Sequence, residues 1–115
     1  MRHLRKGRKF GRVRKVRKAF LRNLEVHLVL KGKIKTTLAR AKELRPRVEK
    51  HVTFAKNNSL AHRRQLIRKL PPKAVERLMS EIAPRFQNRA GGYTRIIRMP
   101  ARKSDGAKMA VIEFV

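Results

Sequence analysis

Cysteine and tryptophan are both absent from this sequence of 115 residues. Without cysteine the chain has no disulfide framework, no thiolate metal site and no cysteine nucleophile. Aromatic residues make up only 5% of the chain, so a core must be built mainly from aliphatic side chains. Hydrophobic residues still reach 41%, which is enough for one modest domain.

Long hydrophobic runs are also missing. No apolar stretch approaches the roughly 18 residues that a membrane-spanning helix requires. The most apolar stretch, residues 19–30, is interrupted by Arg22, Glu25 and His27, so it resembles neither a membrane helix nor the hydrophobic part of a signal peptide. We therefore expect no membrane partner. The Arg-rich N-terminus is also compatible with an organellar transit peptide or a nuclear localisation signal.

Acidic residues are scarce: 7 Asp and Glu accompany 33 Lys and Arg, for a formal net charge of +26. Solubility alone requires much less charge. At physiological salt, screening acts over about 8 Å, so crowded cations still repel one another and oppose compaction. A phosphate backbone reverses that cost, and the release of its counterions contributes to affinity. The charge therefore predicts a polyanionic partner.

The acids and histidines form no catalytic pattern. No two carboxylates make a close pair on one helical face, and each is expected to pair with a neighbouring Arg or Lys. The four histidines lack the spacing of zinc ligands, and His27 is expected to be a packing residue. GxGxxG, Walker and nucleophile-elbow motifs are absent. We expect no catalytic residue, no metal site, no cofactor and no small-molecule substrate, so the chain is not predicted to be an enzyme.

The N-terminal segment is the most basic part of the chain, because residues 1–22 contain no acid. Gly7 and Gly11 interrupt any helix there, and apolar residues are too sparse for a core. One interpretation is a solvated, disordered arm. We favour a basic arm, residues 1–18, that becomes ordered on RNA, followed by a single globular domain, residues 19–115.

Two amphipathic helices are predicted next. The first begins near Val13 and stops at Gly32. Its apolar face is formed by Val16, Ala19, Phe20, Leu24, His27 and Leu28. The second covers residues 38–56, with Thr37 as its cap and a kink or break expected just before Pro46. Its buried face is formed by Ala41, Leu44, Val48, Val52 and Ala55.

Two shorter helices and three strands complete the prediction. Helices are expected over residues 59–70 and from Pro72 to Pro84. β-branched residues predict a short strand at residues 33–37, and residues 93–99 and 108–115 predict a C-terminal antiparallel hairpin. The expected class is α+β, with a small mixed sheet covered by about four helices.

The stretch RFQNRAGGYTRIIR, residues 85–98, places Gly91, Gly92 and the only tyrosine among arginines. Glycine lets a backbone N–H approach a phosphate, or supplies the positive φ of a sharp helix-to-strand turn. Tyr93 has two interpretations as well: it stacks on an unpaired base, or it lies half-buried against the sheet. The arginines offer planar forks for phosphate oxygens.

Three ordered blocks resemble one known family. MRHLRKGRKFGR, residues 1–12, is similar to that family's opening; LRNL, residues 21–24, and KIKTTLARAKELR, residues 33–45, match its middle. The most specific block is PRFQNRAGGYTRI, residues 84–96, followed by DGAKMAVIEFV. The chain thus resembles the bacterial large-subunit ribosomal protein seventeen family over nearly its whole length. It departs from the family pattern at Val16, where His is usual, and at Ala83, where Gly is frequent.

This resemblance implies a structural constituent of the large ribosomal subunit. It implies that the chain binds and stabilises 23S ribosomal RNA near the polypeptide exit tunnel, during assembly and in the mature ribosome. The implied partners are 23S ribosomal RNA and neighbouring large-subunit proteins, with no homo-oligomer. The implied location is the cytoplasmic ribosome, or an organellar one.

The residues expected to contact RNA combine the charge argument with the resemblance. They are Arg2, His3, Arg5, Lys6, Arg8, Lys9, Arg12, Arg14, Lys15, Arg17, Lys18, Arg22, Asn23, Lys33, Lys35, Thr36, Thr37, Lys42, Arg45, Arg85, Arg89, Gly91, Gly92, Tyr93 and Arg95. Phosphate contacts and RNA shape, rather than base sequence, are expected to determine binding. Two alternatives are a nucleoid-type DNA-binding protein, which requires a groove-reading element, and a membrane-active cationic peptide, which the C-terminal strands disfavour.

Overall fold

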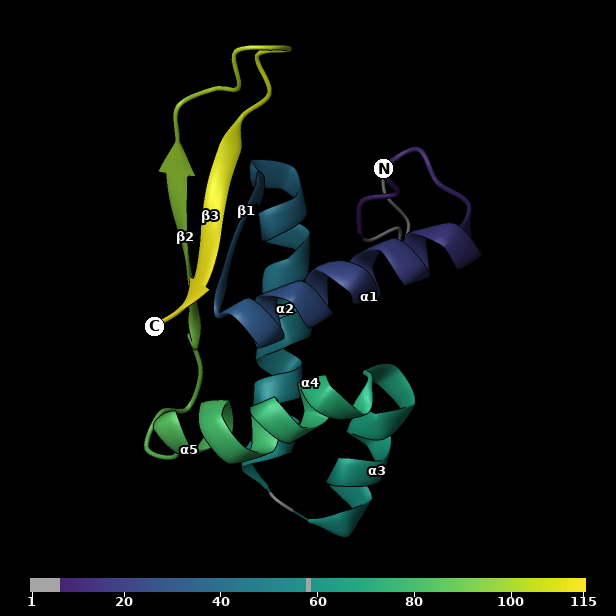
Figure 1. The fold of residues 1–115 in the computed structure, drawn as a ribbon, viewed down its shortest axis with the longest axis vertical. Helices are drawn as coiled ribbons and strands as arrows, with labels where there is room; N and C mark the ends of the chain where they lie inside the picture. The colour runs from purple at the N-terminus through teal and green to yellow at the C-terminus, as the bar shows by residue number, and fades with distance from the viewer. Residues whose placement is uncertain (1–6, 58) are drawn as a thin grey trace, which may run out of the picture.

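In a computed structural model, which describes residues 7–57 and 59–115, helices cover one face of a small antiparallel sheet (Figure 1). The elements follow in the order α1 Arg14–Lys31, β1 Lys33–Thr37, α2 Leu38–Lys56, α3 Leu60–Lys69, α4 Pro72–Arg77, the π-helical turn η1 Leu78–Ile82, α5 Ala83–Arg85, β2 Thr94–Met99 and β3 Met109–Phe114. The α+β class is confirmed. Since α4, η1 and α5 follow one another without a gap, they form one helical segment.

The sheet has the order β1-β3-β2, so the C-terminal strand is central. Lys35 lies opposite Val111, which lies opposite Ile97 on the other side. Both pairings are antiparallel. The predicted hairpin is therefore confirmed, whereas the sheet is not mixed as predicted. The residues of 33–37 identify a strand, but strand direction depends on how the chain returns to the sheet through α2 and the helices that follow.

The buried face of α1 matches the predicted one only in part: Leu28 is buried as predicted, and Phe20 and Leu24 are half-buried. Leu21, Glu25, Leu28 and Val29 are buried, whereas the predicted face residues Val16 and His27 are exposed. The buried face is therefore rotated to include a carboxylate that apolar periodicity assigns to solvent. The predicted stop at Gly32 is confirmed: its φ is 81° and its N–H donates to the Leu28 carbonyl. This left-handed conformation favours glycine.

Helix α2 confirms its predicted face, because Ala41, Leu44, Val48, Val52 and Ala55 are all buried. Its cap is also confirmed: the Thr37 hydroxyl accepts a hydrogen bond from the Arg40 N–H at 3.3 Å. The break predicted before Pro46 is absent, and α2 continues to Lys56. Pro46 lies on the exposed side of α2, while Leu44 and Val48 on the opposite face are buried in the core.

The last helical segment accommodates a proline by widening one turn. Pro84 has no N–H and its ring conflicts with the carbonyl four residues earlier. In η1 the Ala83 N–H donates to the Leu78 carbonyl, five residues back, which is a π-helical bond. The helical segment therefore continues through Pro84 and ends at Arg85.

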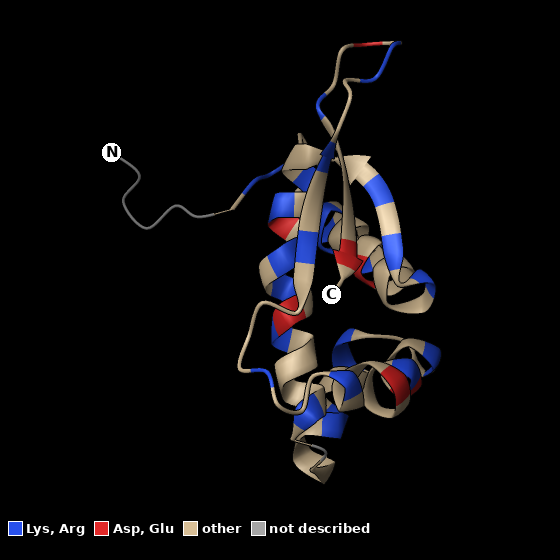
Figure 2. Cartoon of the chain, turned by 90° about the vertical axis from the view of Figure 1, so that its left-hand side faces the viewer, with Lys and Arg blue, Asp and Glu red and all other residues tan. Residues whose placement is uncertain are grey.

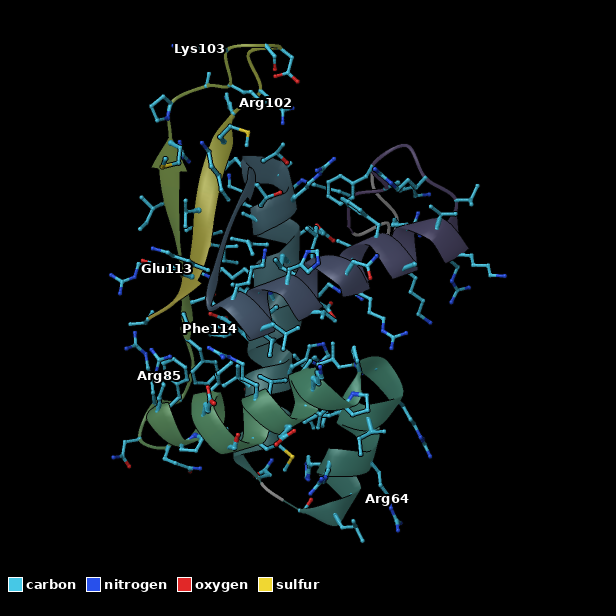
Figure 3. All side chains as sticks on the ribbon, viewed as in Figure 1. Arg64, Arg85, Arg102, Lys103, Glu113 and Phe114 are labelled. Carbon is cyan, nitrogen blue, oxygen red and sulfur yellow. The ribbon has the colours of Figure 1, made fainter. Side chains whose placement is uncertain are left out.

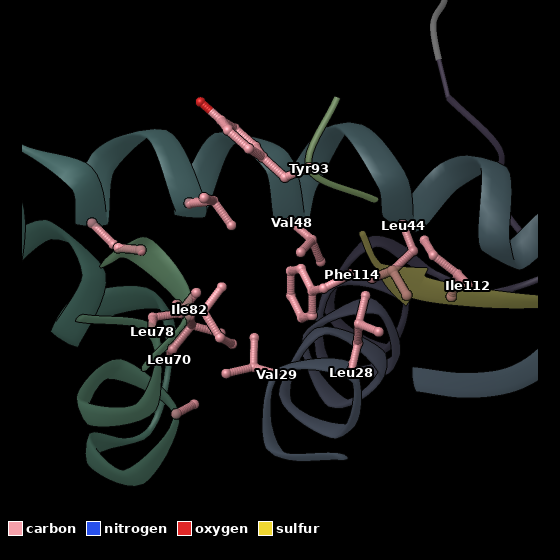
Figure 4. Packing of buried hydrophobic residues seen from close by; sticks show 14 of the residues in the cluster. Leu28, Val29, Leu44, Val48, Leu70, Leu78, Ile82, Tyr93, Ile112 and Phe114 are labelled. Carbon is pink, nitrogen blue, oxygen red and sulfur yellow. The ribbon is translucent and has the colours of Figure 1, made fainter. Parts of the chain in front are cut away.

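The core lies between the sheet, α1, α2 and the α4–α5 segment (Figure 4). Its largest buried side chain is Tyr93, which is 1% exposed. The Tyr93 ring lies 5.2 Å from that of Phe86, which in turn is 6.4 Å from Phe114. Three of the chain's few aromatic rings therefore meet where the helical segment joins the sheet.

Residues 7–13, the part of the predicted arm that is described and precedes α1, fold back beside α1 and the start of α2. The Arg12 N–H donates to the Lys9 carbonyl at 3.1 Å and closes a turn. The Phe20 ring lies 4.1 Å from the Arg12 guanidinium, 4.9 Å from that of Arg40 and 5.7 Å from the Phe10 ring. Residues 14–18 are already helical, and residues 1–6 lie outside the described part.

Candidate nucleic-acid interface

Basic side chains occur on every long helix and on the strands, while acidic ones are few (Figure 2). Among the described residues, six of the seven carboxylates form the predicted ion pairs with nearby basic groups, and the exposed Glu76 does not. These pairs are Glu25 with Arg47 and His51, Glu43 with Arg8, Glu49 with Arg45, Glu81 with Arg77, Asp105 with Arg102, and Glu113 with Arg95. The remaining cations have few acids left to neutralise them.

A groove of about 700 Å³ lies between α1, α2 and α3. We call it the interhelical groove. Its lining consists of Lys15, Lys18, Ala19, Arg22 and Glu25 from α1, Arg47, Lys50 and His51 from α2, and Arg68 and Lys69 from α3. Apart from the alanine, the glutamate and the histidine, every lining residue is a lysine or an arginine. Three helices thus direct positive charge into one hollow.

One buried ion-pair network joins two walls of the interhelical groove. Glu25 on α1 accepts hydrogen bonds from Arg47 Nε and from His51 Nε2 on α2, the latter at 3.1 Å. Burial raises the pKa of Glu25, but the hydrogen bonds and charges of His51 and Arg47 outweigh it, so the pKa lies below the ordinary 4.5. The carboxylate is therefore ionised and neutralised by its partners.

Of the predicted RNA-binding residues, the fold brings Lys15, Lys18 and Arg22 together in this groove. Asn23 and Arg14 are exposed on α1 outside it. Arg17 is half-buried because it donates to the Arg12 carbonyl at 3.4 Å. Helix α1 therefore divides the predicted residues between the groove and other sides.

A second basic group lies where the arm meets α2. Arg8 and Lys42 line a shallow hollow beside Thr37, and Arg8 pairs with Glu43 at 3.2 Å. Lys9 is exposed nearby. The predicted residues Arg2, His3, Arg5 and Lys6 lie outside the described residues.

The third group occupies the open face of the sheet, which no described helix covers. Lys33, Glu113 and Arg95 lie side by side across the three strands, and Arg95 pairs with Glu113 at 3.2 Å. Lys35 is exposed beside Val111 and Ile97. This face is therefore partly apolar and less positive than the interhelical groove.

The arginines of the glycine-rich turn are largely tied to the protein's own backbone. Arg85 donates to the Val115 carbonyl at 3.0 Å and Arg89 to the Gly91 carbonyl at 3.2 Å. Gly92 has a φ of 62°, whereas Gly91 does not have a positive φ. The conformational role of Gly92 is therefore the tight turn between helix and strand.

The burial of two predicted residues, Tyr93 and Thr36, disfavours their contacts with RNA. Tyr93 does not present its ring for base stacking, because the ring is buried and its hydroxyl lies 3.2 Å from Lys56 Nζ. Thr36 is 7% exposed and faces the core, and the Thr37 hydroxyl caps α2. Alternation along the strand turns the Thr36 side chain toward the core. The first turn of α2 needs a hydroxyl as its cap, and Thr37 supplies it. Arg45 forms an ion pair with Glu49 at 3.6 Å but is exposed, so its contact with RNA stays a prediction.

The predicted set omitted Arg47, Lys50, Arg68 and Lys69, which complete the interhelical groove. The signal available in the sequence was their position on helices poor in acids. That signal marks them as basic, but it does not show that they face residues near the N-terminus.

Between residues 7 and 115, with residue 58 excepted, no cluster of three or more His, Asp or Glu side chains is placed to hold a metal ion. In the same part of the chain, no helix combines the length and apolarity needed to cross a bilayer.

Comparison with known proteins gives a consistent result. The family model of ribosomal protein L17 matches residues 20–115. A protein of Thermomicrobium roseum named large ribosomal subunit protein bL17 is 49% identical to this chain over 116 residues, covering 100% of the chain and 99% of that protein. Proteins of the same name from Nautilia profundicola and Methylacidiphilum infernorum are 48% and 49% identical, covering 98% and 88% of their own lengths.

Proposed function

This chain belongs to the ribosomal protein L17 family, and we propose that it is a structural component of the large ribosomal subunit that binds ribosomal RNA. It acts by neutralising phosphates where RNA segments converge, in the mature ribosome and during its assembly. We further propose, from the family resemblance, that its place is near the polypeptide exit tunnel, beside other large-subunit proteins. No reaction is part of this proposal.

The observation that carries the proposal is the unbalanced charge of +26 on a folded α+β body. Six of the seven acids form ion pairs among the described residues, and Arg47 is the only groove cation among their basic partners, so the other cations that line the interhelical groove are left to an external anion. RNA supplies that anion at high density, and counterion release then contributes to affinity. Among the described residues no aromatic ring was found presented for base stacking at the glycine-rich turn, so phosphate contacts are expected to dominate there.

The test is a binding titration with fragments of large-subunit ribosomal RNA, with duplex DNA of equal length as competitor at one salt concentration. We expect the chain to prefer the structured RNA, with affinity falling linearly in a logarithmic plot against salt. Equal binding of duplex DNA would favour the nucleoid-type alternative instead.

The cellular part of the proposal has a separate test. Ribosomes from the source are separated into subunits, and mass spectrometry asks which fraction contains the chain. We expect it in the large subunit, with chemical crosslinks to proteins at the tunnel exit. Its absence from ribosomal particles would reject the proposal, whereas crosslinks elsewhere would reject only the place near the tunnel.

A further inference from the structure

The interhelical groove concentrates charge that the fold itself does not use. Within the described residues, no carboxylate pairs with Lys15, Lys18, Arg22, Lys50, Arg68 or Lys69. Screening at physiological salt acts over about 8 Å, so cations gathered around one hollow repel one another. The protein therefore maintains an arrangement that is unfavourable unless an anion enters the groove.

The buried network keeps the groove open and positive. Glu25 is the groove's only carboxylate, and its two oxygens are taken by Arg47 and His51. An incoming phosphate therefore does not face a free negative charge. Because Glu25 belongs to α1 and its partners to α2, the same network fixes the spacing of two walls.

The chemistry of the lining indicates what binds. Besides the basic residues it contains only Ala19, Glu25 and His51, so the groove offers charge-assisted donors and no Phe or Tyr ring for a base. Arg47 donates its Nε to Glu25, and no described residue accepts from its terminal nitrogens. The arrangement favours phosphate oxygens over base edges.

The volume of the groove limits the size of the ligand that it can hold. A volume of about 700 Å³ lies within the range of pockets that hold small ligands. It is therefore suited to a few linked phosphates of one strand rather than to the width of a duplex. The three walls come from residues far apart in sequence, so the groove exists only in the folded chain.

We propose that the interhelical groove binds a single RNA strand through its sugar-phosphate backbone, independently of base identity. This inference rests on the proposed RNA-binding function and assigns one specific surface to it. Lys18, Lys50 and Arg68 represent the three walls, and all three side chains are exposed.

A charge-matched pair of variants tests the proposal. The groove variant is K18Q/K50Q/R68Q; the control variant, K31Q/R98Q/K103Q, removes the same charges from exposed residues outside the groove. Lys103 lies at the tip of the β2–β3 loop, away from all three groove helices (Figure 3). Thermal unfolding by circular dichroism first establishes that both variants are folded.

Binding is measured with oligouridine, oligocytidine and oligoadenosine RNA of equal length across a salt series. For the groove variant we expect affinity at least tenfold below that of the control. We also expect a salt slope reduced by about 2, because each phosphate contact on a single strand contributes about 0.7. The three RNAs should bind the wild-type chain with affinities within about threefold. Equal losses in the two variants, or strong preference for one base, overturn the proposal.

Lysine reactivity locates the contact without mutation, and so applies even if a variant fails to fold. The wild-type chain is acetylated with and without RNA, and mass spectrometry quantifies each site. We expect protection of Lys15, Lys18, Lys50 and Lys69, with Lys103 unprotected. If the chain binds RNA while the groove lysines stay reactive, the groove assignment is wrong and the proposed function stands. If the chain binds no RNA, the proposed function itself fails.

Discussion

Glu25 of α1 and His51 of α2 are hydrogen-bonded at 3.1 Å in a buried site, although they are 26 residues apart. Arg47 binds the other oxygen of the same carboxylate. A buried ion pair is not in itself evidence of high stability, because desolvation offsets the attraction. Removing the carboxylate is costly all the same, because it leaves His51 unpaired inside the protein and the half-buried Arg47 without its partner.

We therefore expect Glu25→Gln to lower the free energy of unfolding by about 3 kcal/mol. The amide keeps the shape of the side chain but leaves Arg47 without a counter-charge. Urea unfolding followed by circular dichroism measures the change. Glu76→Gln is the matched control, since Glu76 is exposed and forms no ion pair among the described residues, and it should change stability by less than about 0.5 kcal/mol. Similar values for both variants would contradict this account of the network.

The same carboxylate predicts a pH dependence. The pKa of Glu25 in the folded chain lies below 4.5, because the interactions with His51 and Arg47 outweigh the effect of burial. The ionised form is thus favoured by folding. Its stabilising contribution is complete above pH 4.5 and is lost as the pH falls through the lower, folded-state pKa. The difference in the free energy of unfolding between wild type and Glu25→Gln should therefore decrease as the pH falls below 4.5. A gap that stays constant from pH 7 to pH 3 would contradict the shifted pKa.

Tyr93 provides a test of core packing against base stacking. Tyr93→Phe keeps the ring beside Phe86 and loses the hydroxyl contact with Lys56, so we expect a loss of about 1 kcal/mol in stability. Tyr93→Leu removes the ring altogether. Because the ring is buried, RNA affinity of the folded Tyr93→Leu chain should stay within about twofold of wild type. A stacked ring would instead contribute about 1–3 kcal/mol to binding, and a loss of that size would restore the stacking interpretation.

Phe20 is predicted to hold residues 7–13 against the body. Its ring contacts the Arg12 guanidinium and the Phe10 ring, and each of these contacts contributes about 0.5–1 kcal/mol. Phe20→Ala should therefore raise the rate of tryptic cleavage after Arg8, Lys9 and Arg12 roughly tenfold, as the folded-back form becomes less populated. Leu30→Ala on the exposed side of the same helix is the control. Equal cleavage rates would show that the ring does not hold the arm.

The sequence predicted best where apolar periodicity alone determines burial. The face of α2 from Ala41 to Ala55 contains only alanine, leucine and valine at its predicted buried positions, and all are buried. On α1 the same method succeeded only in part, because position 25 of the buried face is a glutamate. Its partners lie on another helix, and single-helix periodicity carries no information about them.

The candidate site was predictable in character but not in shape. Charge counts indicated phosphate, and Lys15, Lys18 and Arg22 were expected to contact it. Arg68 and Lys69 join them only because α3 packs against α2 and brings its C-terminal end to the same groove, which is a tertiary relationship. Tyr93 illustrates the opposite case: surrounding arginines indicated a surface role, and packing against Phe86 placed the ring inside.

Gly32 joins α1 to β1 with no intervening linker. Its N–H is bonded to α1 at Leu28, and its carbonyl accepts from the Phe114 N–H of the central strand at 3.2 Å. A side chain at this left-handed position would be strained, so the bend angle between helix and sheet depends on the absence of a Cβ. The hydrogen bonds of Gly32 to both elements thus fix the angle between α1 and the sheet. A binder that twisted the strands would therefore move α1 and change the width of the interhelical groove, one wall of which is α1.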